Sequence, residues 1–314
     1  MIIDTHGHYF PARYMGRLQE VTPRPRRGGQ PVTGRLPGGD LDALVESMDA
    51  AGVDQTVIGV GAHQPWLPEL KAAVHLATMC NDDYAGAVSD SKGRLLALGC
   101  IPLPYVDRAI AEAERCLSEL GFLGLAFGTR VLDDPLDSPQ FEPLWGALND
   151  LSAVVQVHPV PPLPGEQEPF GLAVAVRGPQ QVCVACARLA LSGVWSRHPR
   201  ITFVATCLGG GIPFFFQRIN QFFSAPPVDT GETNAELDSV AALTSLYYDT
   251  ENGNAAALRC TCDVVGADRV VFGTNFPFSD LKQDVDYIKS SGLPEETVEA
   301  VLSENAKTLF SLKG

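Results

Sequence analysis

Residues 2–11 read IIDTHGHYFP, a short apolar run that ends in two histidines separated by one glycine. A run of this kind predicts a buried β-strand, because short apolar stretches bounded by polar residues, glycine or proline are typical of strands inside a sheet. The polar side chains come at the end of the strand. The same arrangement recurs along the chain.

Eight short apolar runs are predicted strands, and longer amphipathic stretches separate them. The predicted strands are Ile2–Thr5, Thr56–Val60, Leu95–Ile101, Gly124–Phe127, Ala153–Val157, Ile201–Ala205, Ser245–Asp249 and Val270–Thr274. The predicted helices include Leu41–Ala51, Asp107–Leu120, Pro179–Ser196, Asn254–Val265 and Glu296–Leu312. Eight repeated βα units indicate an α/β fold, a (β/α)8 TIM-like barrel. A doubly wound open sheet is the alternative, but it usually carries a phosphate-binding glycine loop after its first strand, and none follows here.

The whole chain, residues 1–314, is predicted to form a single barrel domain with one long loop after the first strand. A length of 314 residues is normal for a barrel that folds as one domain. The loop, residues 22–39, is rich in proline, glycine and arginine. Long loops in compact domains are either functional or disordered, so a lid over an active site and a surface loop are both open interpretations.

Composition excludes several classes of partner. The chain has 23 basic and 37 acidic residues, a net charge of −14. Nucleic acids and anionic membranes are bound by clustered Lys and Arg, so neither partner is expected. The N-terminus lacks the pattern of a signal peptide, and the longest uncharged run, Ile201–Gln217, is broken by glycines and a proline. We expect a soluble, cytoplasmic protein whose eight cysteines are thiols.

Histidines gather at the ends of the predicted strands, where barrels of this kind carry their chemistry. His6 and His8 end the first strand, and His158 ends the fifth. Residues two apart in an extended strand point to the same side, so His6 and His8 converge. Three neutral imidazoles suit Zn²⁺ or a similar divalent metal with an open position for substrate. A polar strand end without a metal is the alternative.

Ordered blocks of the sequence resemble the amidohydrolase-related family of the amidohydrolase superfamily, which includes aminocarboxymuconate semialdehyde decarboxylase and the aromatic-acid decarboxylases. The resemblance runs from Ile2 to about Leu312. The blocks are IIDTHGHYFP, LVESMDAAGVDQTVI, LGCIPLPYVDRAIAEAERCLSELGFLGLAFG, DDPLDSPQFEPLWGALNDLSAVVQVHP, SGVWSRHPRITFVATCLGGGIPFFFQR and DVVGADRVVFGTNFPF. The resemblance implies a metal held by His6, His8 and His158. Its implied partners are a small-molecule substrate and a second copy of the chain in a homodimer.

Two positions depart from the family pattern. The resemblance implies an aspartate after the eighth strand, where this chain has Asn275, and a histidine after the sixth, where it has Cys207. An asparagine carbonyl coordinates only as a neutral oxygen and cannot act as a general base, so metal binding should be weakened. Cys207 either becomes a zinc ligand or nucleophile, if its pKa is lowered, or fills space as a small apolar group. We name Cys207, Asn275 and His158 as candidate catalytic residues.

Three further residues are candidates for substrate binding. Arg218 follows the glycine-rich stretch after the sixth strand, and its planar guanidinium suits a substrate carboxylate. A structural ion pair is the alternative for this arginine. His63 and Arg130 are the other candidates, His63 because it follows the second strand at the mouth of the predicted site.

The sequence therefore predicts an amidohydrolase-family enzyme of the decarboxylase type, a C–C lyase. Its substrate would be a small organic molecule bearing a carboxylate or carbonyl group, and its divalent metal would lie in an atypical site. A metal-dependent hydrolase is one alternative, although no obvious base replaces the aspartate. A metal-free barrel is the other, which would catalyse a rearrangement or cyclisation, or bind a ligand without catalysis.

Overall fold

The computed structural model describes residues 1–22, 26–27, 30–31, 40–162, 168–224, 238–251 and 253–312. Most of the predicted loop 22–39 lies outside the described residues. The part of this loop that is described contains two short strands, β2 (Arg26–Arg27) and β3 (Gln30–Pro31), which pair in antiparallel fashion.

Parallel strands form a closed barrel at the centre of the molecule. Their order is β1 (Ile3–His8), β4 (Gln55–Gly59), β5 (Leu95–Gly99), β6 (Gly124–Gly128), β9 (Val154–His158), β10 (Thr202–Ala205), β11 (Tyr247–Asp249) and β12 (Val270–Val271). Backbone hydrogen bonds close the ring, because the N–H of Thr5 donates to the carbonyl of Phe272 at 2.8 Å and that of Asn275 to the carbonyl of His6 at 2.7 Å. The predicted barrel is confirmed, and each predicted strand overlaps one of these eight.

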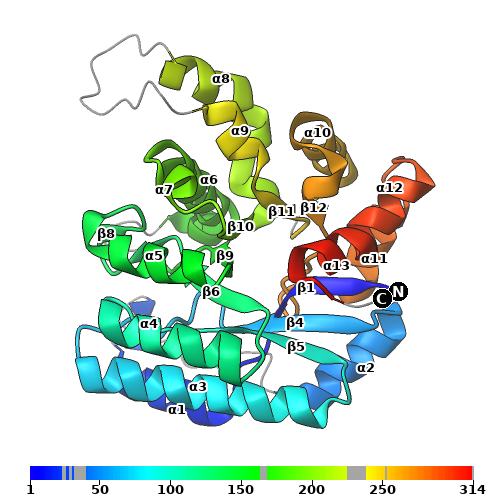
Figure 1. The fold of residues 1–314 in the computed structure, drawn as a ribbon. Coiled ribbons are helices and arrows are strands. Elements are labelled where there is room, and N and C mark those ends of the chain that lie inside the picture. Colours follow the sequence, from blue (N-terminus) through cyan, green and yellow to red (C-terminus); the bar gives the residue numbers. More distant parts are fainter. Residues whose placement is uncertain are drawn as a thin grey trace.

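Helices follow the strands and form the outer layer (Figure 1). They are α1 (Ala12–Val21), α2 (Leu41–Ala51), α3 (Leu70–Asp90), α4 (Val106–Glu114), α5 (Glu142–Asp150), α6 (Gly178–Leu191), α7 (Val194–Arg197), α8 (Ile212–Ser224), α9 (Ser239–Thr244), α10 (Ala255–Val265), α11 (Leu281–Lys289), α12 (Glu295–Glu299) and α13 (Asn305–Phe310). The α2 helix has the predicted bounds, because Asp40 caps its first turn and Gly52, at φ +72°, ends it. The predicted helix Pro179–Ser196 is divided into α6 and α7 by Gly193, at φ +83°.

Aromatic packing fixes the direction of β9. Trp145 on α5 is buried between Phe127 of β6 and Phe203 of β10, with ring centroids 5.5 and 5.7 Å apart. Strand β9 lies between β6 and β10 and pairs with both. Burying large aromatic side chains stabilises such an arrangement, since each removes a large apolar area from water. The strand that carries His158 is therefore held from both sides.

A side-chain hydrogen bond crosses the interior of the barrel. Gln156 of β9 is buried, and its Nε2 donates to the backbone carbonyl of Thr5 on β1 at 3.0 Å. His158 lies two residues beyond Gln156, and His6 follows Thr5 directly. This hydrogen bond between Gln156 and Thr5 therefore helps to set the spacing between the two strand ends that carry histidines.

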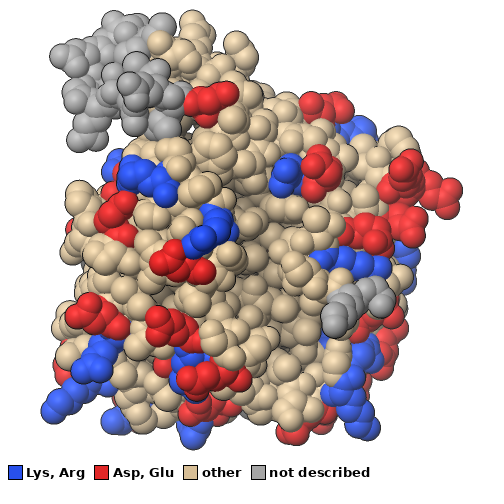
Figure 2. All heavy atoms as spheres, viewed as in Figure 1, with Lys and Arg blue, Asp and Glu red and all other residues tan. Residues whose placement is uncertain are grey.

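One described helical stretch, Pro169–Leu191, is long and apolar enough to cross a membrane by length and composition alone. Its second half is α6, where Val182, Cys186 and Leu189 are buried against the barrel. This stretch is therefore in part a core helix of the barrel. On the face shown in Figure 2, basic and acidic side chains are interspersed around a mainly uncharged centre.

Replacing Gln156 with leucine should lower the free energy of unfolding by about 1–2 kcal/mol, because a buried carbonyl loses its donor while the volume is nearly kept. Urea denaturation measures the change. Gln55→Leu is the matched control, since Nε2 of Gln55 also donates to a backbone carbonyl, that of Gly93, but at the exposed rim. If the free energy of unfolding falls equally in the two variants, the buried hydrogen bond stabilises the barrel no more than the exposed one, which would contradict this prediction.

Candidate metal centre and active-site cavity

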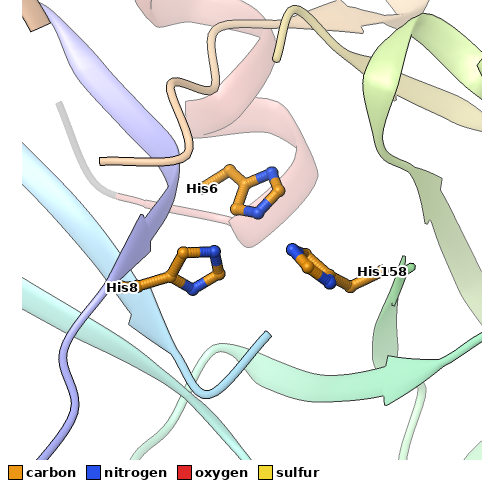
Figure 3. A group of neighbouring side chains, drawn as sticks. All are labelled: His6, His8 and His158. Carbon is orange, nitrogen blue, oxygen red and sulfur yellow. The ribbon is translucent and has the colours of Figure 1, made fainter. Parts of the chain in front are cut away.

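Three histidine rings point toward one space at the carboxyl ends of the strands (Figure 3). His6 and His8 come from β1 and His158 from β9, and all three are buried. Their ring centroids are 5.0 to 5.1 Å apart, and one nitrogen of each lies within 4.8 Å of the others. The structure thus brings the three predicted metal ligands together.

The outer nitrogen of each ring, Nδ1, has an oxygen partner. The partners are the carboxylate of Asp249 for His6 (2.7 Å), the carbonyl of Gly59 for His8 (3.0 Å) and the carbonyl of Pro159 for His158 (2.7 Å). A ring whose Nδ1 donates has a lone pair on Nε2. The Nε2 atoms of His6 and His158 are buried and have no hydrogen-bond partner among the described residues. Buried acceptors that converge in this way fit a divalent cation.

Asp249 orients the ring of His6. This carboxylate is fully buried at the end of β11, and its Oδ1 accepts the backbone N–H groups of Cys207 at 3.0 Å and Glu251 at 3.1 Å. Burial by itself lowers the pKa of His6, but the charge and hydrogen bond of Asp249, and then the charge of Glu251, raise that pKa to about 9. A carboxylate on Nδ1 also makes Nε2 a stronger metal ligand, and a bound cation takes the place of the proton there.

Burial favours the neutral form of the other two histidines. Burial, followed by repulsion from His6, lowers the pKa of His8 to about 3. The same two causes hold the pKa of His158 well below its usual value. Neutral imidazole is the form that binds metals, so these two rings can bind a metal without first losing a proton.

Asn275 touches this cluster. Its Oδ1 lies 2.8 Å from Nε2 of His8, and its Nδ2 donates to Oε1 of Glu251 at 2.7 Å. The residue has φ +69°, in the left-handed region that asparagine tolerates better than most side chains. The amide therefore connects the histidines to a buried carboxylate on the neighbouring strand end.

Cys207 lies on the other side of that carboxylate. Its thiol donates to Oε2 of Glu251 at 2.9 Å. Burial, and then the charges of Glu251 and Asp249, raise the pKa of Cys207 well above its usual value. A nucleophilic or metal-binding thiolate needs a lowered pKa, so these surroundings favour a protonated thiol.

Neither Asp249 nor Glu251 is among the site residues predicted from the sequence. Their spacing is like that of His6 and His8, because they are two apart at the carboxyl end of a strand, with Asp249 ending β11 and Glu251 two residues beyond it. This spacing is the sequence feature from which the two carboxylates could have been predicted as site residues.

A cavity of about 950 Å³ opens next to the histidines. Its wall is mostly apolar and includes Phe10, Val174, Phe214 and Phe278. Among the described residues that line it, Glu251 is the one carboxylate, and there is no lysine or arginine. A molecule in this cavity therefore meets polar groups mainly at the histidine end.

The three candidate substrate-binding residues lie in different places. His63 lines the cavity, with its ring 5.1 Å from that of Phe10. Arg218 is exposed on α8, where its guanidinium lies 4.6 Å above the ring of Phe222. Nη2 of Arg130 donates to the carbonyl of Pro161 at 2.8 Å. Neither arginine is among the described lining residues.

The chain is similar in sequence or in fold to several decarboxylases. Gamma-resorcylate decarboxylase from Rhizobium radiobacter is 29% identical over 290 residues, which cover 87% of this chain and 88% of that protein. The solved 5-carboxyvanillate decarboxylase from Sphingomonas paucimobilis has the same fold, with a TM-score of 0.89, 21% identity and 99% of both chains covered. A 5-carboxyvanillate decarboxylase from Novosphingobium aromaticivorans, complexed with manganese and 4-hydroxy-3-methoxy-5-nitrobenzoic acid, has a TM-score of 0.86 at 19% identity, covering 99% of this chain and 96% of that one.

The family model described as Amidohydrolase matches residues 3–312. These residues include β1 with its two histidines, the cavity wall and every later strand of the barrel. Because the match spans nearly the whole chain, this protein belongs to the amidohydrolase family.

Proposed function

We propose that the chain is a metal-dependent decarboxylase of aromatic carboxylic acids, a C–C lyase. The observation that carries the proposal is the set of three buried imidazoles that face one space beside an apolar cavity. The names of the relatives support it, since gamma-resorcylate decarboxylase and 5-carboxyvanillate decarboxylase are decarboxylases of substituted benzoic acids.

His6, His8 and His158 would hold the metal, with the carbonyl of Asn275 as a neutral oxygen beside them. A divalent cation bound there supplies Lewis-acid chemistry, because it polarises the oxygens of an acid substrate. Zinc is the metal predicted from the ligand types, and two related solved structures contain manganese. A site of imidazole nitrogens and one carbonyl oxygen suits either ion.

The cavity fits an aromatic body with one acidic end. Phe10, Phe278 and His63 supply rings on its wall, and aromatic pairs prefer edge-to-face or offset contacts. Because the described lining residues include no lysine or arginine, the substrate carboxylate would face the histidine end. With a substrate bound, the apolar wall would limit the access of water to the reacting carbon.

Decarboxylation breaks the bond between the ring carbon and the carboxylate, and the electron pair stays on that carbon. Carbon dioxide leaves, and the ring carbon takes up a proton. Asn275 has no proton to give in the relevant pH range. The thiol of Cys207 lines the cavity and carries a proton, so we assign proton delivery to its Sγ–H. Glu251, which accepts from Sγ at 2.9 Å, is the group that orients this thiol.

A homodimer and a cytoplasmic location are further parts of the proposal. Exposed apolar side chains support self-association, since Phe214 is 80% and Phe222 40% exposed on α8. Phe170 and Val174, before α6, are 94% and 76% exposed. Exposed apolar groups in such number often mark a contact with another protein. Arg218, on α8, would then lie at the contact between subunits rather than in the cavity.

Replacing His158 with alanine should remove one of the three nitrogens and with it both metal binding and turnover. We expect decarboxylation of a hydroxybenzoate panel to fall at least about 100-fold, as for a lost metal ligand. Released carbon dioxide and elemental analysis of the purified chain measure the two effects. His75→Ala is the control, because His75 is exposed on α3. If the His158 variant kept the turnover of the parent, the proposed function would be contradicted.

Replacing Phe214 with glutamate should dissociate the dimer, because a charge would be buried at the apolar contact. We expect the dimer dissociation constant to rise at least about tenfold, measured by analytical ultracentrifugation. Leu70→Glu is the matched control, since Leu70 is an exposed apolar residue on α3, at the opposite side of the molecule in Figure 1. A monomeric parent chain would contradict this part of the proposal.

A further inference from the structure

The amide of Asn275 lies between two polar neighbours, and neither of its two orientations gives both neighbours a hydrogen-bond donor. Nδ1 of His8 donates to the carbonyl of Gly59 at 3.0 Å, so Nε2 of the neutral ring carries a lone pair. Oδ1 of Asn275 lies 2.8 Å from that Nε2. When Nε2 carries no proton, which is the form that binds a metal, both atoms are acceptors, and two acceptors facing each other repel unless a positive charge lies between or beside them.

Turning the amide over does not remove the conflict. Nδ2 of Asn275 would then donate to His8, but Oδ1 would face Oε1 of Glu251, which now accepts from Nδ2 at 2.7 Å. A carboxylate repels a carbonyl oxygen more strongly than a neutral imidazole nitrogen does, because it carries a full charge. Glu251 therefore selects the orientation in which the Asn275 carbonyl faces the histidines.

A cation satisfies this orientation. The lone pairs on Oδ1 of Asn275 and Nε2 of His8 can both coordinate one ion, which turns a repulsive contact into two attractive ones. The Nε2 atoms of His6 and His158, for which the described part of the chain offers no hydrogen-bond partner, face the same space. The amide orientation that Glu251 imposes is thus the one that suits a metal.

Glu251 also brings a charge that the inner groups lack. Three imidazoles and one amide are neutral when they bind a metal. The Glu251 side chain is only 4% exposed, and Oε2 lies 3.8 Å from Nδ1 of His6. Water screens such a buried charge weakly, so its attraction for a nearby divalent cation is strong.

We propose that Glu251 is the positioning residue of the metal centre. It turns Asn275 so that a neutral oxygen faces the cation, and its own carboxylate balances the cation's charge from behind that amide and the thiol of Cys207. This inference rests on the metal centre of the proposed function and is independent of the reaction that the loaded enzyme catalyses.

The test is the metal affinity of Glu251→Gln. Glutamine keeps an oxygen that can accept from Asn275 but removes the charge. We expect the affinity for Zn²⁺ and for Mn²⁺ to fall about 10–100-fold, the range typical of residues behind metal ligands. Competition with a chromogenic chelator measures it on the full chain, and the rise in Tm on adding metal is a second readout. Affinity within about threefold of the parent overturns the role of Glu251.

Glu112→Gln is the matched control. Glu112 is also a buried carboxylate, and it accepts from Asn81 at 2.7 Å and Arg115 at 2.7 Å, between outer helices. The same chemical change there should leave metal affinity at the parental value even if Tm falls. A parent chain that binds no metal would remove the proposed metal centre itself, which is a different outcome from equal binding by parent and Glu251→Gln.

Asn275→Asp tests the inference without changing Glu251. The sequence predicts stronger metal binding for this variant, because an anionic ligand is restored. With Oε1 of Glu251 only 2.7 Å from the amide, the new carboxylate meets a like charge, and much of the gain is lost. We expect a gain below about threefold alone and about tenfold when Glu251→Gln is also present. A tenfold gain from Asn275→Asp alone overturns the proposal.

Discussion

The hydrogen bond between Nδ1 of His6 and Oδ2 of Asp249, 2.7 Å long and fully buried, organises the functional end of the barrel. It joins β1 to β11, and the second oxygen of the same carboxylate holds the backbone N–H groups of Cys207 and Glu251. A buried carboxylate without partners costs several kcal/mol, so Asp249 is stable only with these donors around it. The ring of His6, the turn after β10 and Glu251, two residues beyond β11, are therefore positioned together.

This unit also supports unusual backbone geometry. Cys207, Leu208 and Asn275 have φ values of +56°, +50° and +69°, which L-residues other than asparagine rarely adopt. Such conformations cost of order 1–3 kcal/mol each and persist where surrounding contacts determine them. Here the N–H of Cys207 bonds to Asp249, and the N–H of Asn275 bonds to the carbonyl of His6. Two of these three residues, Cys207 and Asn275, carry the side chains that donate to Glu251, so the backbone strain and the polar site belong to one structure.

The fold and the three histidines could be predicted from the sequence because both depend on local signals. Strands buried on both faces appear as continuous apolar runs, and the residue type at a strand end is read directly. The role of Glu251 depends on how close β10, β11 and β12 come when the barrel closes, which no local pattern encodes. Arg218 shows the same limit, because its place after the glycine-rich turn did not reveal that α8 turns it outward over Phe222. Because α8 also carries exposed phenylalanines, its sequence pattern does not indicate which face of the helix is buried.

The two departures from the family pattern, Cys207 and Asn275, are parts of one arrangement, since both donate to Glu251. A carboxylate bound directly to a cation gives up charge to it and weakens its pull on substrate oxygens. Placed behind a neutral amide, the carboxylate still offsets the cation's charge at a distance, so the cation keeps more of its Lewis acidity. The cavity is consistent with this arrangement, because its described lining residues include no lysine or arginine to hold an acid substrate. In the proposed site, where the cation alone attracts the substrate carboxylate, neutral ligands preserve that attraction, and Glu251 adds negative charge from behind them.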